Sequence, residues 1–266
     1  LKLMELHISK GNLGLLVAAI AAAFVIIEVG LRLIGVSYPY FTQTDPYTGF
    51  ALRPHAAGWQ RDEGMAFVRI NSHGFRDKER TKIKTQGKIR IAGLGDSYVE
   101  ARQVTQEKTF TAVMEQEMQS CRPTEVLNFG VSGFSTVQEF LLLQQRVWEF
   151  DPDIVLLAFT TGNDVKGNSK ELSQGKDQPY MQKRGSELIP DFTFRDSDNY
   201  KSQNSASVRA IHAIVNRSRV AQVLNRARVR LRSSPTPIGT DRDQYGAEIG
   251  LDSEIYSPPL TPDWVT

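Results

Sequence analysis

A short apolar stretch from Lys88 to Leu94 (KIRIAGL) runs directly into Gly95-Asp96-Ser97. This pattern predicts a strand that ends in a glycine turn, with a serine at the start of the next helix. In open α/β sheets, ligands bind outside the carboxyl ends of the parallel strands. We therefore expect Ser97 to lie at the edge of the sheet where a ligand would bind.

Two further segments repeat this arrangement. Thr124 to Phe129 is a predicted strand that leads into Gly130-Val131-Ser132-Gly133, and Asp153 to Phe159 is a predicted strand that leads into Gly162-Asn163-Asp164. The third strand is apolar throughout its middle, which is typical of a strand that is covered on both faces.

Amphipathic helices are expected between these strands. Phe110, Val113, Met114 and Met118 share one face of a predicted helix from Lys108 to Cys121. A second predicted helix runs from about Thr136 to Phe150, with Val137, Phe140, Leu141 and Val147 facing inward. Alternating strands and helices with short connections predict right-handed crossovers and a doubly wound parallel sheet.

The length and composition are compatible with this fold. The chain has 266 residues, 40% of them hydrophobic, which is enough for one α/β domain and a short appendage. A net charge of +2 does not indicate a nucleic-acid partner. The single cysteine, Cys121, excludes an intrachain disulfide and a cysteine-based metal site.

The N-terminal region contains an uninterrupted run of apolar and small residues from Leu13 to Ile27. As a helix this run would be roughly 22 Å long, and about 34 Å if it continues to Gly35. The extension includes Glu28 and Arg32, whose spacing and order favour a helical ion pair.

Three interpretations of this run compete: a membrane-spanning anchor, a cleaved signal peptide, and a buried helix of a soluble domain. No convincing small-x-small cleavage site follows the run, so we favour the anchor. Lys2 and Lys10 precede it, which favours an orientation with the body of the protein in the periplasm or outside the cell. Arg32 on the other side weakens that preference.

The remaining segments are less regular. Residues 37–87 are rich in turn residues, with an expected edge strand at Val68-Arg69-Ile70-Asn71 followed by a Ser72-His73-Gly74 turn. Residues 166–205 are expected to form a polar surface insertion, residues 207–232 a helix, and residues 233–259 a loop. We divide the chain into an anchor with its flank (1–36), the irregular segment (37–87) and the α/β domain (88–266).

The predicted strand ends bring together residues suited to acyl transfer. That reaction needs a nucleophile and hydrogen-bond donors for the oxygen that becomes negative. Ser97 offers a hydroxyl and its own N–H, and Gly133 offers an N–H that no Cβ obstructs. The Asn163 carboxamide offers a third donor that does not titrate. The alternative is a purely structural role for each residue: a helix cap for Ser97 and turn positions for Gly130, Gly133 and Asn163.

These blocks resemble the SGNH, or GDSL-type, esterase and lipase superfamily. The resemblance covers roughly Ile89 to Asp164: the nucleophile block at Gly95-Asp96-Ser97, the glycine block at Asn128–Gly133 and the asparagine block at Gly162-Asn163-Asp164. It implies a three-layer, flavodoxin-like α/β fold and a cofactor-free serine esterase. The segment Asn71–Arg76, together with the anchor, is similar to a membrane-attached bacterial branch of that superfamily.

One block of the superfamily is not found. Its general base is the histidine of an Asp-x-x-His block near the C-terminus, and no aspartate stands three positions before His7, His55, His73 or His212. We expect a C-terminally truncated chain whose base lies beyond residue 266; a divergent enzyme with another base is the alternative. His73 and His212 are expected to be surface or packing residues.

The same residues are compatible with more than one function. The expected substrate is a small ester, a lipid or an envelope glycan. Transfer or removal of carbohydrate O-acetyl groups is an alternative reaction, and a non-catalytic SGNH-like binding domain is an alternative class. Tyr98 stands where a dinucleotide fingerprint needs glycine, and Asp96 and Asp164 have too few neighbouring ligands to favour a metal.

The arginine-rich stretch from Arg217 to Arg232 lacks the interleaved aromatic residues of a nucleic-acid site. A solvated helix face, or one that touches anionic lipid headgroups, is the favoured interpretation.

Overall fold

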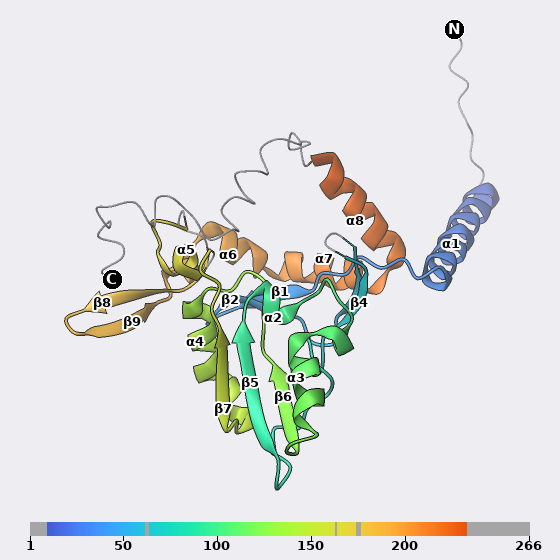
Figure 1. Cartoon of the computed structure of the whole chain (residues 1–266). Helices are drawn as coiled ribbons and strands as arrows, with labels where there is room; N and C mark the ends of the chain where they lie inside the picture. The colour runs from blue at the N-terminus through green and yellow to red at the C-terminus, as the bar shows by residue number, and fades with distance from the viewer. Residues whose placement is uncertain (1–9, 62–63, 163, 174–176, 233–266) are drawn as a thin grey trace, which may run out of the picture. The chain divides into compact units, whose positions relative to one another are not determined.

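The computed structural model describes residues 10–61, 64–162, 164–173 and 177–232 (Figure 1). These residues form two compact units, and each is treated by itself. One unit comprises residues 40–210, and the other comprises residues 10–39 with 211–232.

The larger unit is a mixed α/β structure built on a small parallel sheet. Its strands are β5 (Ile89–Gly95), β6 (Thr124–Asn128) and β7 (Ile154–Ala158), in the order β6-β5-β7. Ile91 of the central strand pairs with Val126 on one side and with Ile154 on the other. The three strands predicted from the sequence, and their parallel pairing, are therefore confirmed.

Short helices follow the strands. They are α2 (Ser97–Glu100), α3 (Phe110–Met118), α4 (Thr136–Gln145) and α5 (Asp164–Asn168). Helix α3 packs against β6 and α4 against β5. Ser135 precedes α4 and forms a capping box: its N–H donates to Gln138 Oε1, and its side chain accepts from the Gln138 N–H. Both predicted long helices end earlier than expected, and Phe140, predicted to face inward, is 43% exposed.

The expectation that the third strand is covered on both faces is wrong for the described residues. Ile154 and Leu156 on one face of β7 are exposed, and so is Leu157 on the other. Helices α3 and α4 pack on β6 and β5, and among the described residues no helix packs comparably on β7, so both of its faces are left partly open. Central β5, in contrast, is buried along almost its whole length.

The irregular segment contains two antiparallel hairpins. One joins β1 (Thr42–Asp45) to β2 (Gly49–Leu52), and the other joins β3 (Ala57–Gln60) to β4 (Ala66–Arg69). The strand expected at residues 68–71 thus begins two residues earlier, as β4. It pairs with β3 and not with the parallel sheet.

The Asn71–Arg76 motif folds into a compact turn. The Asn71 side-chain oxygen accepts hydrogen bonds from the N–H groups of His73 and Phe75, while Gly74 adopts a φ of +79°. Phe75 enters the core edge-on to Phe129, with ring centroids 4.6 Å apart. The motif therefore fastens the irregular segment to the parallel sheet.

The polar segment after Asp164 is more ordered than expected from its composition. It contains a hairpin of β8 (Tyr180–Arg184) and β9 (Glu187–Asp191), then α6 (Asp198–Gln203) and the start of α7 (Ala206–Arg217). The loop expected at residues 233–259 lies outside the described residues.

The smaller unit contains α1 (Lys10–Leu33), the second half of α7, and α8 (Arg219–Arg232). Residues Asn12–Leu33 of α1 are long and apolar enough to cross a membrane, and none of that helix is buried. This excludes the buried-helix interpretation and leaves a signal sequence or a single anchor. The expected ion pair between Glu28 and Arg32 is present, at 2.7 Å.

The single helix predicted for residues 207–232 is interrupted. Ser218 separates α7 from α8, and its hydroxyl accepts a hydrogen bond from Ala221 N at 3.1 Å. Serine competes with helix continuation by capping the helix that follows it.

Candidate functional site

Ser97 is the first residue of α2, at the carboxyl end of β5, and is half-buried. Gly95 adopts a φ of +158°, and a Cβ there would lie 2.2 Å from a methyl carbon of Val99. Asp96 is buried and caps the helix, accepting a hydrogen bond from Tyr98 N at 2.9 Å. The glycine and the aspartate thus define the turn that positions Ser97.

The loop after β6 packs directly against α2. Val131 N donates to Gly95 O at 3.0 Å. A Cβ on Gly130 would lie 2.4 Å from Glu100 N and 2.6 Å from Val99 Cβ. Gly130 is therefore required for this close approach, which brings the second predicted block against the helix that begins with Ser97.

A buried carboxylate fixes this arrangement. Glu100, fully buried, accepts hydrogen bonds on Oε2 from both the N–H and the hydroxyl of Ser132. The same carboxylate pairs with Arg102, which lies over the Phe41 ring. Ser132, one residue before Gly133, is thereby tied to the last residue of α2.

Arg76 holds the other end of α2. Its guanidinium donates to the carbonyl oxygens of Glu100, Ala101 and Val104, where the chain leaves the helix through Ala101 at a φ of +51°. Burial lowers the pKa of Arg76 to about 10, so the side chain stays charged at neutral pH. The Asn71–Arg76 motif therefore has a structural role next to the predicted site.

The third strand end meets the same region. Ala158, the last residue of β7, pairs with Gly95. Helix α5 then packs against the start of α4, where a Cβ on Gly167 would lie 2.7 Å from Ser135 Cβ and Val137 N bonds Asn168 Oδ1 at 3.1 Å.

Gly133 and Asn163 are the other two predicted oxyanion donors. Gly133 is exposed, with a φ of +84°, and a Cβ there would make only an ordinary contact with Phe50 Cζ, at 3.7 Å. Asn163 lies outside the described residues, so its position relative to Ser97 stays a prediction. The three loops that carry Ser97, Gly133 and Asn163 nevertheless begin at the same edge of the sheet.

Three buried carboxyl groups lie beside these loops. Asp96, Glu139 and Asp164 influence each other electrostatically, and Glu139 is only 1% exposed. Neither carboxyl oxygen of Glu139 has a hydrogen-bond partner, and one carboxyl oxygen of Asp164, Oδ1, also lacks one. Burial, with the charges of Asp164 and Asp96, raises the pKa of Glu139 to about 8.

The pKa of Asp164 is also raised. Burial and the charge of Asp96 raise its pKa to about 6, although Thr160 N donates to its Oδ2 at 2.6 Å. Among the described residues, no group of three or more His, Cys, Asp or Glu side chains is arranged to hold a metal ion.

The histidines of the described residues have other surroundings. His73 Nε2 lies 2.9 Å from Arg80 O, and its ring packs edge-on to Phe150. This confirms the packing role expected for His73. His212 is half-buried on α7, in the smaller unit, where burial lowers its pKa.

The described part of the larger unit includes two sizeable pockets. One, of about 730 Å³, lies between the start of α4, helix α5 and the β8–β9 hairpin, and includes Thr136, Phe140, Val165 and Met181. Its Thr136 hydroxyl oxygen is buried without a partner. It is the more apolar pocket and lies next to Asp164.

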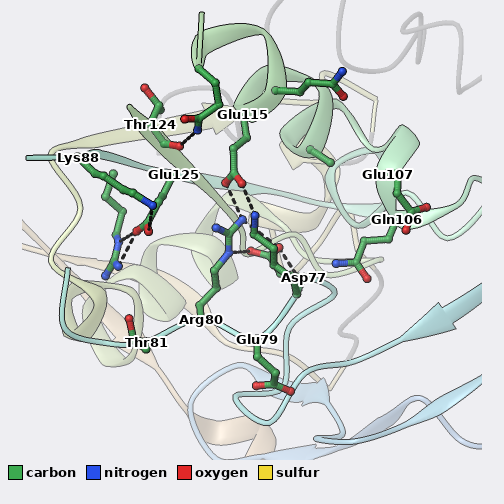
Figure 2. A pocket seen from close by; sticks show the side chains of 15 residues that line it. Asp77, Glu79, Arg80, Thr81, Lys88, Gln106, Glu107, Glu115, Thr124 and Glu125 are labelled. Atoms are coloured by element: carbon green, nitrogen blue, oxygen red, sulfur yellow. Dashed lines mark hydrogen bonds and ion pairs between the residues drawn. The ribbon is translucent and has the colours of Figure 1, made fainter. Parts of the chain in front are cut away.

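The other pocket, of about 740 Å³, is lined by charged side chains around β6 (Figure 2). Arg80 donates to Asp77, Glu115 and the carbonyl of Val126, while Glu115 accepts from Val126 N. Asp77 accepts from Asn128 N at 3.2 Å. These side chains supply hydrogen-bond partners for the backbone groups on the outer edge of β6, which is a structural role.

Sequence reasoning missed Glu100, Arg76 and Glu139 as parts of this region. Glu100 follows Ser97 by three residues, and Glu139 lies between Val137 and Leu141, which were both predicted to face inward. A charged residue on an expected buried face was the available signal for Glu139.

Comparison with models of known protein families and with curated proteins finds no match to this chain.

Proposed function

We propose that this chain carries a serine esterase site of the SGNH type in a three-layer, doubly wound sheet. Ser97 is the nucleophile, and the N–H groups of Ser97 and Gly133 with the Asn163 carboxamide form the oxyanion hole. The site needs no cofactor. The substrate is an ester of a small molecule, a lipid or an envelope glycan.

One observation carries the proposal: the loop of the glycine block packs on the helix that starts with Ser97. The approach is so close that a methyl group at Gly130 would overlap Glu100 N. Glu100 also holds Ser132 by two hydrogen bonds, one residue from Gly133. Preorganised donors of this kind stabilise a developing negative charge without reorganisation during the reaction.

The reaction has a simple balance of bonds and protons. Ser97 Oγ attacks the ester carbonyl carbon while its proton passes to a general base, and the carbonyl oxygen becomes negative in the oxyanion hole. Collapse breaks the bond to the alcohol, which leaves with the proton. Water then attacks the acyl-serine, releases the carboxylic acid and restores the hydroxyl.

None of the described residues is assigned as the general base, which is proposed to lie outside them. His73 is engaged with Arg80 O and packs on Phe150, so it is not assigned to Ser97. The apolar pocket beside Val165 and Met181 is the proposed position of the acyl chain or another apolar part of the substrate.

Hydrolysis of an aryl acetate by the membrane-bound protein tests the proposal. Ser97→Ala should abolish turnover, and Asn163→Ala should reduce kcat by about 100- to 1,000-fold, the cost of one oxyanion donor. Ser120→Ala is the matched control, since Ser120 is an exposed serine at the end of α3 whose hydroxyl bonds only Glu117 O and Cys121 among the contacts described.

The control should retain full activity. Turnover that survives Ser97→Ala contradicts the esterase assignment. No turnover by the parent protein, with a carbohydrate ligand bound at the same edge of the sheet, would favour the binding-domain alternative.

A further inference from the structure

Helix α8 has an unusual composition for a helix of a soluble domain. Its sequence, RVAQVLNRARVRLR, contains five arginines and no acidic residue. A helix with this charge is not stabilised by ion pairs along its own surface, and it favours a negatively charged partner.

The apolar residues of α8 follow helical spacing. Val220, Leu224, Ala227 and Leu231 form one stripe, in which Leu224 is 65% and Leu231 87% exposed. By the same spacing, the helical positions of Arg228 and Arg230 belong to opposite flanks of the stripe, whereas Arg226 shares the face of Gln222. An apolar stripe between two rows of arginine is the pattern of a helix that lies in a lipid interface.

The opposite face of α8 is already occupied within the smaller unit. Gln222 is buried, its Oε1 accepts from Tyr38 N at 2.7 Å, and its Nε2 donates to Asn216 O. Arg226 lies over the Tyr38 ring, 5.7 Å from its centroid. These contacts fix the rotation of α8, so the apolar stripe lies on the side away from Tyr38.

The start of α8 lies at the level where α1 stops being apolar. Glu28, the residue after the apolar run, accepts hydrogen bonds from Arg219 N at 2.9 Å and Val220 N at 3.0 Å. Ser218 Oγ donates to the same carboxylate, and Arg32 donates to Arg217 O. The N-terminus of α8 is therefore capped by a carboxylate in the last part of the candidate membrane span, Asn12–Leu33.

These contacts also bear on the nature of α1. A cleaved signal peptide leaves the mature protein and has no need of tertiary contacts with a distant helix. Glu28 and Arg32 together contact four consecutive residues, Arg217 to Val220, about 190 positions away in the chain. The contacts favour an anchor that stays attached.

We propose that α8 is an interfacial helix that lies on an anionic lipid surface beside the anchor, with Leu224 and Leu231 directed into the bilayer. The arginines on the flanks of the stripe then face phosphate groups, which are the negative partner that the helix lacks in its own sequence. This inference is independent of the proposed esterase activity.

Depth-dependent quenching in vesicles tests this arrangement. The full chain, with Cys121→Ser, is reconstituted with a bimane label on Leu224→Cys or on Val229→Cys. Both positions are exposed and apolar, at 65% and 48%, but they belong to different faces of α8. Vesicles of phosphatidylcholine with about 30% phosphatidylglycerol contain a small fraction of lipid that is spin-labelled on the upper part of its acyl chain.

The label at position 224 should be quenched at least about threefold more than the label at position 229, because only the former faces the acyl chains. Quenching at position 224 should fall in pure phosphatidylcholine and in an Arg228→Gln variant. Circular dichroism checks that each variant keeps its helices.

Equal quenching at the two positions would contradict the interfacial placement. Equal quenching at position 224 in the two lipid mixtures would contradict the anionic surface. A label at position 224 that is shielded from the spin label only when the protein dimerises would assign the stripe to a second copy, and would also overturn the proposal.

Discussion

The Glu100 carboxylate accepts two hydrogen bonds from Ser132, one from its backbone N–H and one from its hydroxyl. Glu100 ends the helix that begins with Ser97, and Ser132 precedes Gly133. The contact therefore couples two loops that are more than thirty residues apart in the chain, and it makes their geometry depend on one buried charge.

Glu100→Gln should destabilise the larger unit by about 3 kcal/mol. The substitution leaves Arg102 without its buried partner and replaces a charged acceptor by a neutral one. Urea unfolding followed by tryptophan fluorescence measures the loss. Glu149→Gln, at an exposed pair with Lys82, is the control and should cost less than about 1 kcal/mol. Equal effects would show that Glu100 does not hold the loop.

Gly130→Ala should cost about 3 kcal/mol because the added methyl group would overlap backbone and side-chain atoms of α2. The comparison is Gly87→Ala, where φ is +82° and no atom lies within 4 Å of the new Cβ. That control should lose only about 1 kcal/mol from the left-handed conformation. Thermal unfolding distinguishes the two, and a Gly130→Ala variant as stable as the control would disprove the close packing.

Glu139 should make stability fall as pH rises. Its folded pKa of about 8 lies above the ordinary value of 4.5, so between these two values the folded state holds a proton that the unfolded state has released. The free energy of unfolding should decrease by up to about 1.4 kcal/mol per pH unit in that window. Asp164, with a pKa of about 6, adds the same trend between about 3.8 and 6.

Glu139→Gln should remove most of this slope between pH 6 and 8. Urea titrations at several pH values provide the measurement, and Glu117→Gln, on the exposed side of α3, should leave the slope unchanged. An unaltered slope in Glu139→Gln would mean that the carboxyl is already ionised at neutral pH.

Arg80→Met should destabilise the protein by about 3–5 kcal/mol. It removes the cation shared by Asp77 and Glu115 and leaves the Val126 carbonyl without its partner. Arg122→Met, at an exposed arginine before β6, should be nearly neutral. Comparable losses in both variants would contradict the assigned role of Arg80 at the β6 edge.

The parallel sheet was predictable because each strand is a short apolar run followed by glycine. Three such runs with helices between them leave few other topologies. The turn at Gly95 and the close approach at Gly130 follow from the absence of a Cβ, which the sequence shows directly. The apolar helix α1 was predictable because a long uninterrupted run of apolar residues is by itself sufficient to indicate such a helix.

The features that could not be predicted from the sequence depend on contacts between distant residues. The break at Ser218 comes from a hydroxyl that caps α8 and also bonds Glu28, which no local pattern shows. Glu139 was missed because helical spacing was assigned from apolar residues only. Coverage of β7 was predicted from its apolar sequence, but which helices pack on a strand depends on distant parts of the chain, so its exposure could not be foreseen.

The account depends most on Ser97 being an activated hydroxyl at the edge of the sheet. Treatment of the protein with a fluorophosphonate probe, followed by mass spectrometry of its peptides, measures this directly. The account predicts one phosphonate adduct, on Ser97, that disappears in Ser97→Ala and persists in Ser120→Ala. An adduct that survives Ser97→Ala, or a parent protein that takes up no probe, would contradict it.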